Sequence, residues 1–209
     1  MPFNIAIIDY EMGNLKSIYK LFRYLEVKST ITSDPKNIKD ADGVILPGVG
    51  AFGDAMKHLN EKNLITTIED IVKEKKPLFG ICLGLHLLFS QSSEMGKHKG
   101  LDMVKGRVIS FDKTKVDKIP QIGWNNVQIL DENHFLVKEI PNNAYFYFVH
   151  SFYAIPKEDE TILGKTNYGE TEFCSIVCKD NIIATQFHPE KSGKYGIKMY
   201  QNFIHYCRK

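Results

Sequence analysis

Three short, uninterrupted apolar runs within the first 90 residues constrain the fold more than any other feature. They are "NIAIID" (4–9), "GVILPG" (43–48) and "PLFGI" (77–81). Continuous runs of this length are typical of strands that are covered on both faces. Between them lie amphipathic helical patterns, "GNLKSIYKLFRYLE" (13–26), with Asn14 placed as a cap, and "ITTIEDIVKEKK" (65–76). This alternation predicts an open, mostly parallel central sheet with helices on both faces.

Beyond Gly100 the pattern changes to short strand candidates that are separated by turn residues. These candidates are "GRVISF", "NVQIL", "AYFYFVH", "TILGKT", "CSIVCKD" and "NIIATQF". Such a series favours antiparallel pairing, so we expect an antiparallel extension of the parallel sheet. A last helix is expected after "GKYG" (193–196), and no repeat or linker interrupts the chain. We therefore expect residues 1–209 to form a single domain.

Composition excludes several classes of function. The formal net charge of +2, without a dense block of Lys and Arg, provides no electrostatic footprint for nucleic acid. No apolar run approaches the length of a membrane span, and "MPFNIAIIDY" lacks the pattern of a cleavable leader, so we expect a cytoplasmic protein without membrane contact. The four cysteines are few and scattered, as reduced thiols would be. Cys174 and Cys178 lack further ligands nearby, which argues against a metal site.

Cys82 stands between Gly80 and Gly84 where the strand "PLFGI" runs into a helix that begins at Leu83. Ligands bind at the carboxyl ends of strands in an open parallel sheet, and glycines suit a sharp strand-to-helix turn. Unpaired N–H groups at a helix N-terminus favour a thiolate and can stabilise an oxyanion. A small buried apolar cysteine is the alternative interpretation. The remaining chain must decide between the two.

The second chemical feature is "TQFHPEKS" (185–192), in which "NIIATQF" predicts a strand that ends at His188. Pro189 stops the strand from continuing as a paired central strand. His188 and Glu190 would then project from this end toward the crevice that holds Cys82. A thiolate nucleophile needs a base, and the base needs a third group to orient its ring. Cys82, His188 and Glu190 supply that set, although a structural histidine beside a turn proline is the simpler alternative.

With these motifs the chain resembles the class I glutamine amidotransferases, and within them the glutaminase subunits of imidazole glycerol phosphate synthases of histidine biosynthesis. The resemblance spans nearly the whole chain and rests on "GICLG" together with "IIDYEMGNL" (7–15), "LPGVGAFGDAM" (46–56), "IGWN" (122–125), "YFVHSFY" (147–153) and "QFHPEKSG" (186–193). "PGVGAFGD" discriminates best, because relatives that act on other acceptors carry a different loop there. The resemblance implies a flavodoxin-like glutamine amidotransferase type 1 domain.

The resemblance also implies roles for individual residues. Cys82, His188 and Glu190 would form a Cys-His-Glu triad that hydrolyses L-glutamine. The N–H groups of Leu83 and Val49 would stabilise the oxyanion, and Gly48 and Gly50, through their freedom at positive φ, would let the loop around Val49 reorient. Substrate-binding positions are Gly50, His86, Ser151 and Phe152.

Ammonia released in water would be protonated and lost, so the resemblance implies transfer to a partner. The expected partner is a (β/α)8-barrel cyclase/synthase subunit, bound as a heterodimer, that makes imidazole glycerol phosphate and aminoimidazole carboxamide ribotide. Trp124, Tyr147 and Lys191 match positions at this subunit contact and ammonia gate. The resemblance implies no cofactor and no metal.

The chain departs from the family pattern twice. His86 stands where a glutamine is usual, one helical turn after Cys82, and its side chain should lean back over the cysteine as a substitute hydrogen-bonding group. Glu11 replaces a glycine. Two alternatives to the histidine-pathway subunit remain open: a paralogous glutaminase that feeds a barrel amidinating a surface-polysaccharide sugar, and a catalytically silent regulatory or assembly subunit.

Overall fold

In the computed structural model, which describes residues 2–209, five parallel strands form one half of a long sheet. Their order across the sheet is β2 (Ser29–Thr32), β1 (Ile5–Ile8), β3 (Gly43–Leu46), β4 (Leu78–Ile81) and β13 (Ile182–Thr185). Ile45 of β3 lies in register with Ile7 of β1 and Phe79 of β4. All residues of β1, β3, β4 and β13 are buried, as the apolar runs predict.

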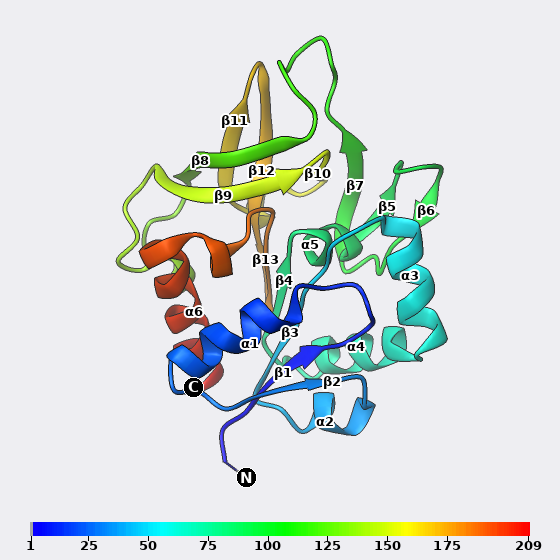
Figure 1. Ribbon diagram of the computed structural model, residues 1–209, viewed down its shortest axis with the longest axis vertical. Coiled ribbons are helices and arrows are strands. Elements are labelled where there is room, and N and C mark those ends of the chain that lie inside the picture. Colours follow the sequence, from blue (N-terminus) through cyan, green and yellow to red (C-terminus); the bar gives the residue numbers. More distant parts are fainter. Residues whose placement is uncertain (1) are drawn as a thin grey trace.

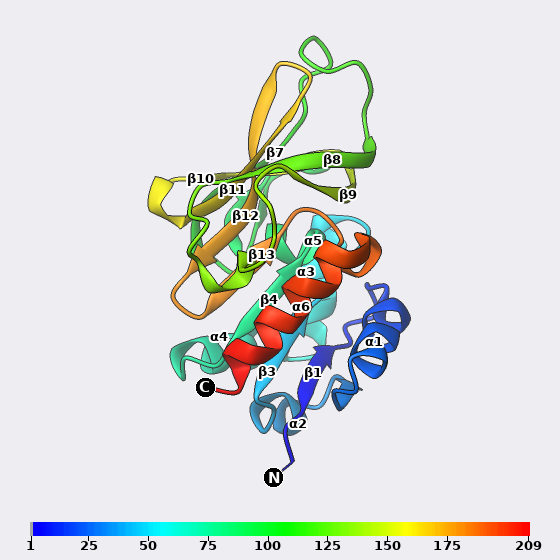
Figure 2. The same ribbon diagram turned by 90° about the vertical axis from the view of Figure 1, so that its left-hand side faces the viewer.

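Alternating side chains from these strands reach two helical layers. Ile5 and Ile7 pack on one face with α1 (Leu15–Tyr24) and α6 (Gly193–Cys207). Ala6 and Ile8 pack on the other face with three helices: α2 (Pro35–Lys39), α3 (Phe52–Glu61) and α4 (Leu64–Lys73). Figure 2 shows α6 and α1 on the near side of the strands. The predicted sheet with helices on both faces is confirmed.

The antiparallel extension begins where β12 (Thr171–Lys179) pairs with β13. Next in the sheet come β10 (Phe152–Pro156), β7 (Val104–Ser110), β5 (Phe89–Ser92) and β6 (His98–Lys99). A branch runs from β12 through β11 (Ile162–Tyr168) and β8 (Gln121–Ile129) to β9 (Ala144–His150). In Figure 1 this extension occupies the end of the molecule opposite the N-terminus. The predicted extension is therefore present, although β5 pairs parallel with β7.

Several local details differ from the sequence pattern. Helix α6 begins at Gly193, so "GKYG" is its first turn and does not precede it. Asn14 is the N-terminal boundary residue of α1, but its side chain accepts a hydrogen bond from the Ser17 hydroxyl at 3.0 Å and caps no backbone N–H. The sequence does not predict β2, because this edge strand leaves only Thr32 buried and lacks an apolar run.

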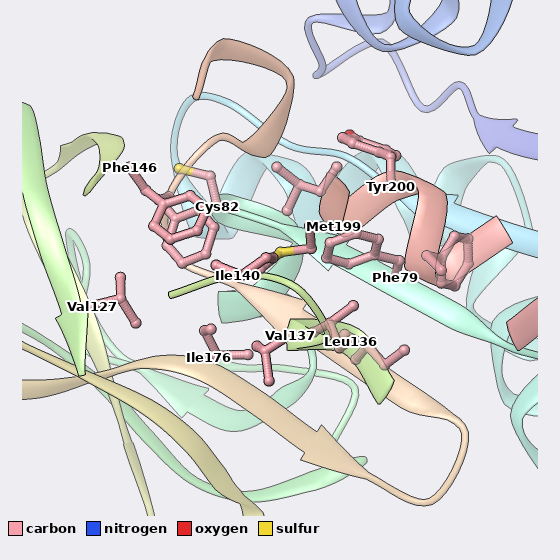
Figure 3. Close-up of a cluster of buried hydrophobic side chains, with 14 of the residues drawn as sticks. Phe79, Cys82, Val127, Leu136, Val137, Ile140, Phe146, Ile176, Met199 and Tyr200 are labelled. Carbon is pink, nitrogen blue, oxygen red and sulfur yellow. The ribbon is translucent and has the colours of Figure 1, made fainter. Parts of the chain in front are cut away.

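One apolar cluster joins the parallel half to the extension. In Figure 3 it includes Phe79 of β4, Met199 and Tyr200 of α6, and Phe146 of β9. Cys82 belongs to the same cluster and is 7% exposed. The cysteine therefore lies at the junction of the two halves, on a firmly packed support. Among residues 2–209, no helix combines the length and apolar character that crossing a bilayer requires.

Candidate active site

Cys82 occupies a sharp corner between β4 and the short helix α5 (Leu83–Leu87). Its backbone has φ 54° and ψ −107°, which is a strained conformation for a residue that is not glycine. The Cys82 N–H donates to the Thr185 carbonyl at 2.8 Å and so ties the corner to β13. A Cβ at Gly84 would lie 1.9 Å from the Leu46 carbonyl oxygen, so only glycine allows this close approach. The corner is a nucleophile elbow in geometry.

His188 and Glu190 form a buried pair at the carboxyl end of β13. The strand ends at Thr185, three residues before His188, and Pro189–Lys191 forms a single 3₁₀ turn. His188 Nδ1–H donates to Glu190 Oε1 at 2.8 Å, and the two side chains are only 3% and 1% exposed. The Ser192 hydroxyl donates to the His188 carbonyl at 2.6 Å and fixes the turn. Because Glu190 occupies Nδ1, the other ring nitrogen of His188, Nε2, is free for proton transfer.

The environment of His188 favours its charged form. Burial lowers its pKa, but the contact with Cys82 and the hydrogen bond to Glu190 outweigh burial and raise the pKa to about 10. Cys82 and His188 line the same cavity. A protonated imidazole next to a thiol is the arrangement that holds a thiolate ready for attack. Cys82 Sγ also approaches the Val149 carbonyl oxygen at 3.8 Å.

The hydrogen-bond partner of the His86 side chain is Gln186, on the strand side of the nucleophile corner. His86 Nε2–H donates to Gln186 Oε1 at 2.7 Å, and Gln186 Nε2 lies 4.0 Å from Cys82 Sγ. Burial lowers the pKa of His86 to about 4, so the ring is neutral near pH 7. Gln186 therefore connects the His86 ring to the Cys82 sulfur. Sequence reasoning missed this residue, whose position two residues before His188 is its only signal.

The Val49 loop is in a conformation that withholds its N–H from the cavity. Val49 N–H donates to the Met12 carbonyl at 3.2 Å. Gly50 has φ +98°, a conformation that glycine adopts readily. In this conformation the φ of Gly48 is not positive, and its lack of a side chain allows close packing. A Cβ there would lie 2.5 Å from the Tyr10 hydroxyl oxygen and 2.8 Å from Leu83 Cβ.

A cavity of about 310 Å³ opens in front of Cys82, within the usual size range for small-molecule sites. Its lining brings together residues of both halves: Val49, Gly50, Cys82, Leu83, His86, Glu94, Pro120, Val149, His150, Ser151, Phe152 and His188. All the predicted substrate-binding residues line this cavity.

Sequence reasoning missed four residues of the cavity wall, Glu94, Pro120, Val149 and His150, of which Glu94 and His150 have ionisable side chains. Glu94 Oε2 accepts from the Phe52 N–H at 2.8 Å, which fixes a carboxylate at the cavity. His150 Nδ1–H donates to the Phe152 carbonyl at 2.7 Å, and Nε2 lies 3.0 Å from Gln121 Oε1. Burial lowers the pKa of His150 to about 3. The neutral ring thus holds the turn that presents Ser151 and Phe152.

Trp124, Tyr147 and Lys191 come together outside the cavity. Trp124 of β8 is opposite Tyr147 of β9, with ring centroids 6.2 Å apart, and Lys191 Nζ lies 5.9 Å from the Tyr147 ring centroid. Trp124 is 56% exposed, and Ile122 and Tyr145 extend the apolar surface of the two strands. Exposed aromatic side chains are typical of a protein interface.

The other cysteines lie apart from this chemistry. Cys174 and Cys178 are both in β12, and burial raises the pKa of the Cys174 thiol to about 12. Burial also raises the pKa of Cys178 and of Cys207 in α6. These three groups are therefore neutral thiols near neutral pH.

Comparison with known proteins identifies the family. Residues 6–207 match the family described as "Glutamine amidotransferase class-I". The imidazole glycerol phosphate synthase subunit HisH of Sulfurimonas denitrificans is 45% identical over 97% of this chain and 98% of its own length. The subunit of the same name from Methanocaldococcus jannaschii is 49% identical, over 96% of this chain and 98% of its own length.

A solved structure of PurLQS from Thermotoga maritima has the same fold, with a TM-score of 0.78 at 16% identity over 99% of both chains. The chain belongs to the class I glutamine amidotransferases and, within them, to the family of imidazole glycerol phosphate synthase subunits named HisH.

Proposed function

We propose that this chain is the glutaminase subunit of an imidazole glycerol phosphate synthase. It hydrolyses L-glutamine to glutamate and ammonia and passes the ammonia to a (β/α)8-barrel cyclase/synthase subunit. That partner makes imidazole glycerol phosphate and aminoimidazole carboxamide ribotide in histidine biosynthesis. The observation that carries the proposal is the strained corner of Cys82, which shares one cavity with His188, the hydrogen-bond partner of Glu190.

Cys82 is the nucleophile of the reaction. Its thiolate attacks the carboxamide carbon of glutamine and forms a C–S bond, while the carbonyl electrons move to oxygen. The protonated His188 then gives its proton to the departing nitrogen, the C–N bond breaks, and ammonia leaves a glutamyl thioester. Neutral His188 next removes a proton from water, which cleaves the thioester and restores Cys82. Glu190 holds the ring through its 2.8 Å bond to Nδ1.

The cavity offers complementary groups for the two ends of glutamine. Glu94 supplies a carboxylate for the α-ammonium group, and the fixed bond from Phe52 N–H orients it. Gly50, His86 and the Ser151–Phe152 turn supply polar contacts from the facing walls. Because Cys82 lies on the same wall as His86, the carboxamide end would point toward the junction of β4 and α5.

The Leu83 and Val49 N–H groups are the oxyanion donors in this proposal. Because Val49 N–H donates to the Met12 carbonyl, one donor is withheld and the loop must turn before the site is complete. Removal of one oxyanion donor typically lowers turnover by about 10²–10³-fold. A reorientation at Gly50 could therefore switch the enzyme without movement of the triad.

The exposed aromatic surface of β8 and β9 is the proposed contact for the barrel subunit. Trp124, Tyr147 and Lys191 form its polar and aromatic centre, and Tyr147 connects it to the active site because the Tyr147 carbonyl accepts from His188 N–H at 2.9 Å. Ammonia released at His188 would therefore leave next to this contact. The cation and the two aromatic rings would line the exit.

The two alternatives differ in testable ways. The names of the full-length relatives favour the histidine-pathway acceptor over a surface-polysaccharide sugar. The buried His188–Glu190 pair, 2.8 Å apart beside Cys82, favours an active site over a silent subunit.

Steady-state glutamine hydrolysis is the direct test. It would be measured for the isolated subunit, for its complex with the barrel subunit, and for the complex with the barrel's nucleotide substrate. We expect slow hydrolysis by the subunit alone and strong activation in the last case. Absence of hydrolysis in all three would refute the function, and acceptance of a surface sugar instead would assign the paralogous pathway.

A further inference from the structure

The hydroxyl of Tyr10 is a buried polar group that the reaction described above does not use. Tyr10 is 1% exposed, and its hydroxyl donates to the Pro47 carbonyl at 2.6 Å. Burial raises the pKa of Tyr10, and the charge of Cys82 adds to this effect. The hydroxyl therefore keeps its proton and remains a hydrogen-bond donor throughout the neutral pH range.

Three neighbouring strands bring this hydrogen bond to the corner at Cys82. Tyr10 is the second residue after β1, Pro47 directly follows β3, and Cys82 directly follows β4. Strand β3 lies between β1 and β4, and all three run parallel, so their carboxyl ends meet at one edge of the sheet. The Tyr10 hydroxyl thus joins the segment after β1 to the first residue of the Val49 loop (residues 47–50).

Gly48 packs between the Tyr10 hydroxyl and the beginning of α5. A Cβ at Gly48 would lie 2.5 Å from the Tyr10 hydroxyl oxygen and 2.8 Å from Leu83 Cβ. The hydroxyl therefore closes one side of a narrow space, and Leu83, the other expected oxyanion donor, closes the opposite side. The base of the loop has little room to move before Val49.

The segment after β1 holds the Val49 loop a second time, in a different way. Met12, two residues after Tyr10, accepts from Val49 N–H at 3.2 Å. Val49 is 41% exposed and Gly50 has φ +98°, whereas Pro47 is buried. The bond at Pro47 is therefore a buried contact at the base of the loop, and the bond at Val49 is a longer contact at its exposed part. Only the second bond must break for the Val49 N–H to turn.

We propose that Tyr10 is a positioning residue that fixes the base of the Val49 loop, so that the Val49 N–H reaches the oxyanion once its bond to Met12 is released. The inference rests on the proposed function of this loop. The turn rotates the peptide that joins Gly48 to Val49, whereas the Pro47 carbonyl belongs to the preceding peptide and can stay bonded to Tyr10. Without the hydroxyl, the buried carbonyl would lose this donor and the base of the loop would shift.

The first test is Tyr10→Phe, assayed as glutamine hydrolysis in the complex with the barrel subunit and its nucleotide. We expect kcat to fall about tenfold with an unchanged KM, because the oxyanion donor is misplaced but still present. Tyr10 is not among the residues that line the cavity. Tyr168→Phe is the matched control, since the Tyr168 hydroxyl also donates to a backbone carbonyl, that of Lys118 at 2.9 Å. It should retain wild-type kcat.

Two measurements separate positioning from a loss of folded protein. The ratio of the activated rate to the rate of the isolated subunit should fall several-fold in Tyr10→Phe, since only the activated state uses the Val49 donor. A loss of folded protein would lower both rates by the same factor and leave this ratio at its wild-type value. The alkylation rate of Cys82 by iodoacetamide, followed by intact mass with Cys82→Ala as background, should match wild type because it needs no oxyanion donor.

A double-mutant cycle tests whether Tyr10 acts through the Val49 donor. Gly50→Ala, which strains the loop at φ +98°, should remove this donor by itself. Tyr10→Phe should then have little further effect on kcat in the Gly50→Ala background. If Tyr10→Phe does not fold, Tyr10→Leu replaces it in all these assays.

Five outcomes would overturn the inference. They are wild-type kcat in Tyr10→Phe, a wild-type activation ratio, slower alkylation of Cys82, an undiminished effect in the Gly50→Ala background, or unfolding of both Tyr10→Phe and Tyr10→Leu, which would make the contact structural. Failure of the proposed function is recognised separately, because Cys82→Ala would then retain glutamine hydrolysis. Loss of hydrolysis in Cys82→Ala together with wild-type kcat in Tyr10→Phe would reject only the positioning role.

Discussion

The parallel half of the sheet and its antiparallel extension make different contributions to one cavity. The parallel half supplies Cys82 at the end of β4, and His188 and Glu190 just beyond β13. The extension supplies the facing wall, with Ser151 and Phe152 at the start of β10. The proposed reacting groups thus lie on one side of the cavity, and two of the proposed substrate-binding residues, Ser151 and Phe152, lie on the other.

The two regions also differ in how their strands are covered. Strands β1, β3, β4 and β13 are buried along their whole length. Strands β8 and β9 alternate, so that Phe146 and Phe148 are in the core while Trp124 and Tyr145 face outward. A fully covered strand gives a rigid support for the strained corner at Cys82. A half-exposed ribbon leaves a surface that a partner subunit can use.

Cys82→Ala should abolish the catalytic contribution of the parallel half. We expect glutamine hydrolysis and glutamine-dependent synthesis to fall by at least about 10⁴-fold, because no covalent intermediate can form. Synthesis from added ammonium salts by the complex should be unchanged, since the fold and the partner contact remain. If the ammonia-dependent reaction disappears too, the cysteine is structural.

His188→Ala should be nearly as severe, with a loss of about 10³–10⁴-fold in kcat, because the nucleophile loses its base and the acid for ammonia release. Glu190→Ala should lose about 10–10²-fold, since an orienting group is partly dispensable. Steady-state kinetics of the two variants in the complex would rank them. Equal severities, or the reverse order, would contradict the assigned roles.

Gly50→Ala tests the loop between the two regions. Its φ of +98° is unfavourable for alanine, and a new Cβ would lie 2.7 Å from Met12 Cε. We expect the activated rate of glutamine hydrolysis to fall about 10²-fold, the loss of one oxyanion donor. The assay compares variant and wild type with partner and nucleotide present. Cys82 alkylation, which needs no oxyanion donor, should be unaffected; full activation of the variant would refute a gated loop.

The parallel half was largely predictable because its signals are local. Apolar runs specified β1, β3 and β4, and the glycines around Cys82 indicated a close strand-to-helix turn that the 1.9 Å approach at Gly84 requires. The edge strand β2 could not be predicted, because most of its residues are not buried and its sequence therefore lacks an apolar run. Resemblance to a family supplied Ser151 and Phe152, which no local pattern identifies.

Tertiary contacts account for what the sequence could not predict. The Glu94 carboxylate is held at the cavity by a hydrogen bond from the Phe52 N–H, 42 positions away in the chain. His86 makes its hydrogen bond with Gln186, 100 positions away in the chain, and the helical spacing from Cys82 gives no sign of this partner. The Val49–Met12 hydrogen bond is likewise invisible in either segment alone.

Trp124→Ala tests the exposed side of the extension. An exposed aromatic at the centre of an interface typically contributes about 2 kcal/mol, so the barrel subunit should bind about 30-fold more weakly. Isothermal titration calorimetry measures this change. Tyr24→Ala on α1, another exposed aromatic, is the control and should bind normally. Unchanged affinity in Trp124→Ala would place the partner contact elsewhere.

His86→Gln should have the smallest effect on catalysis and a distinct effect on acid stability. If the imidazole only stands in for the usual amide, the glutamine KM should be unchanged or lower. A large fall in turnover would show instead that His86 has its own part in tuning the thiol.

The acid effect follows from burial of the neutral ring, which lowers the pKa of His86 to about 4 in the folded protein. An unfolded histidine titrates near pH 6.5, so between about pH 6.5 and 4 the unfolded state binds a proton that the folded state does not. Stability from this residue is therefore present above pH 6.5 and is lost as the pH falls. From pH 7 to 5 His86 therefore lowers the free energy of unfolding by about 2 kcal/mol. The His86→Gln variant should not show this loss, although the loss that comes from His150 should remain. Urea unfolding at both pH values measures the difference, with the exposed His205→Gln as control. If wild type and His86→Gln lose the same free energy of unfolding between pH 7 and 5, the His86 ring accepts a proton in the folded state.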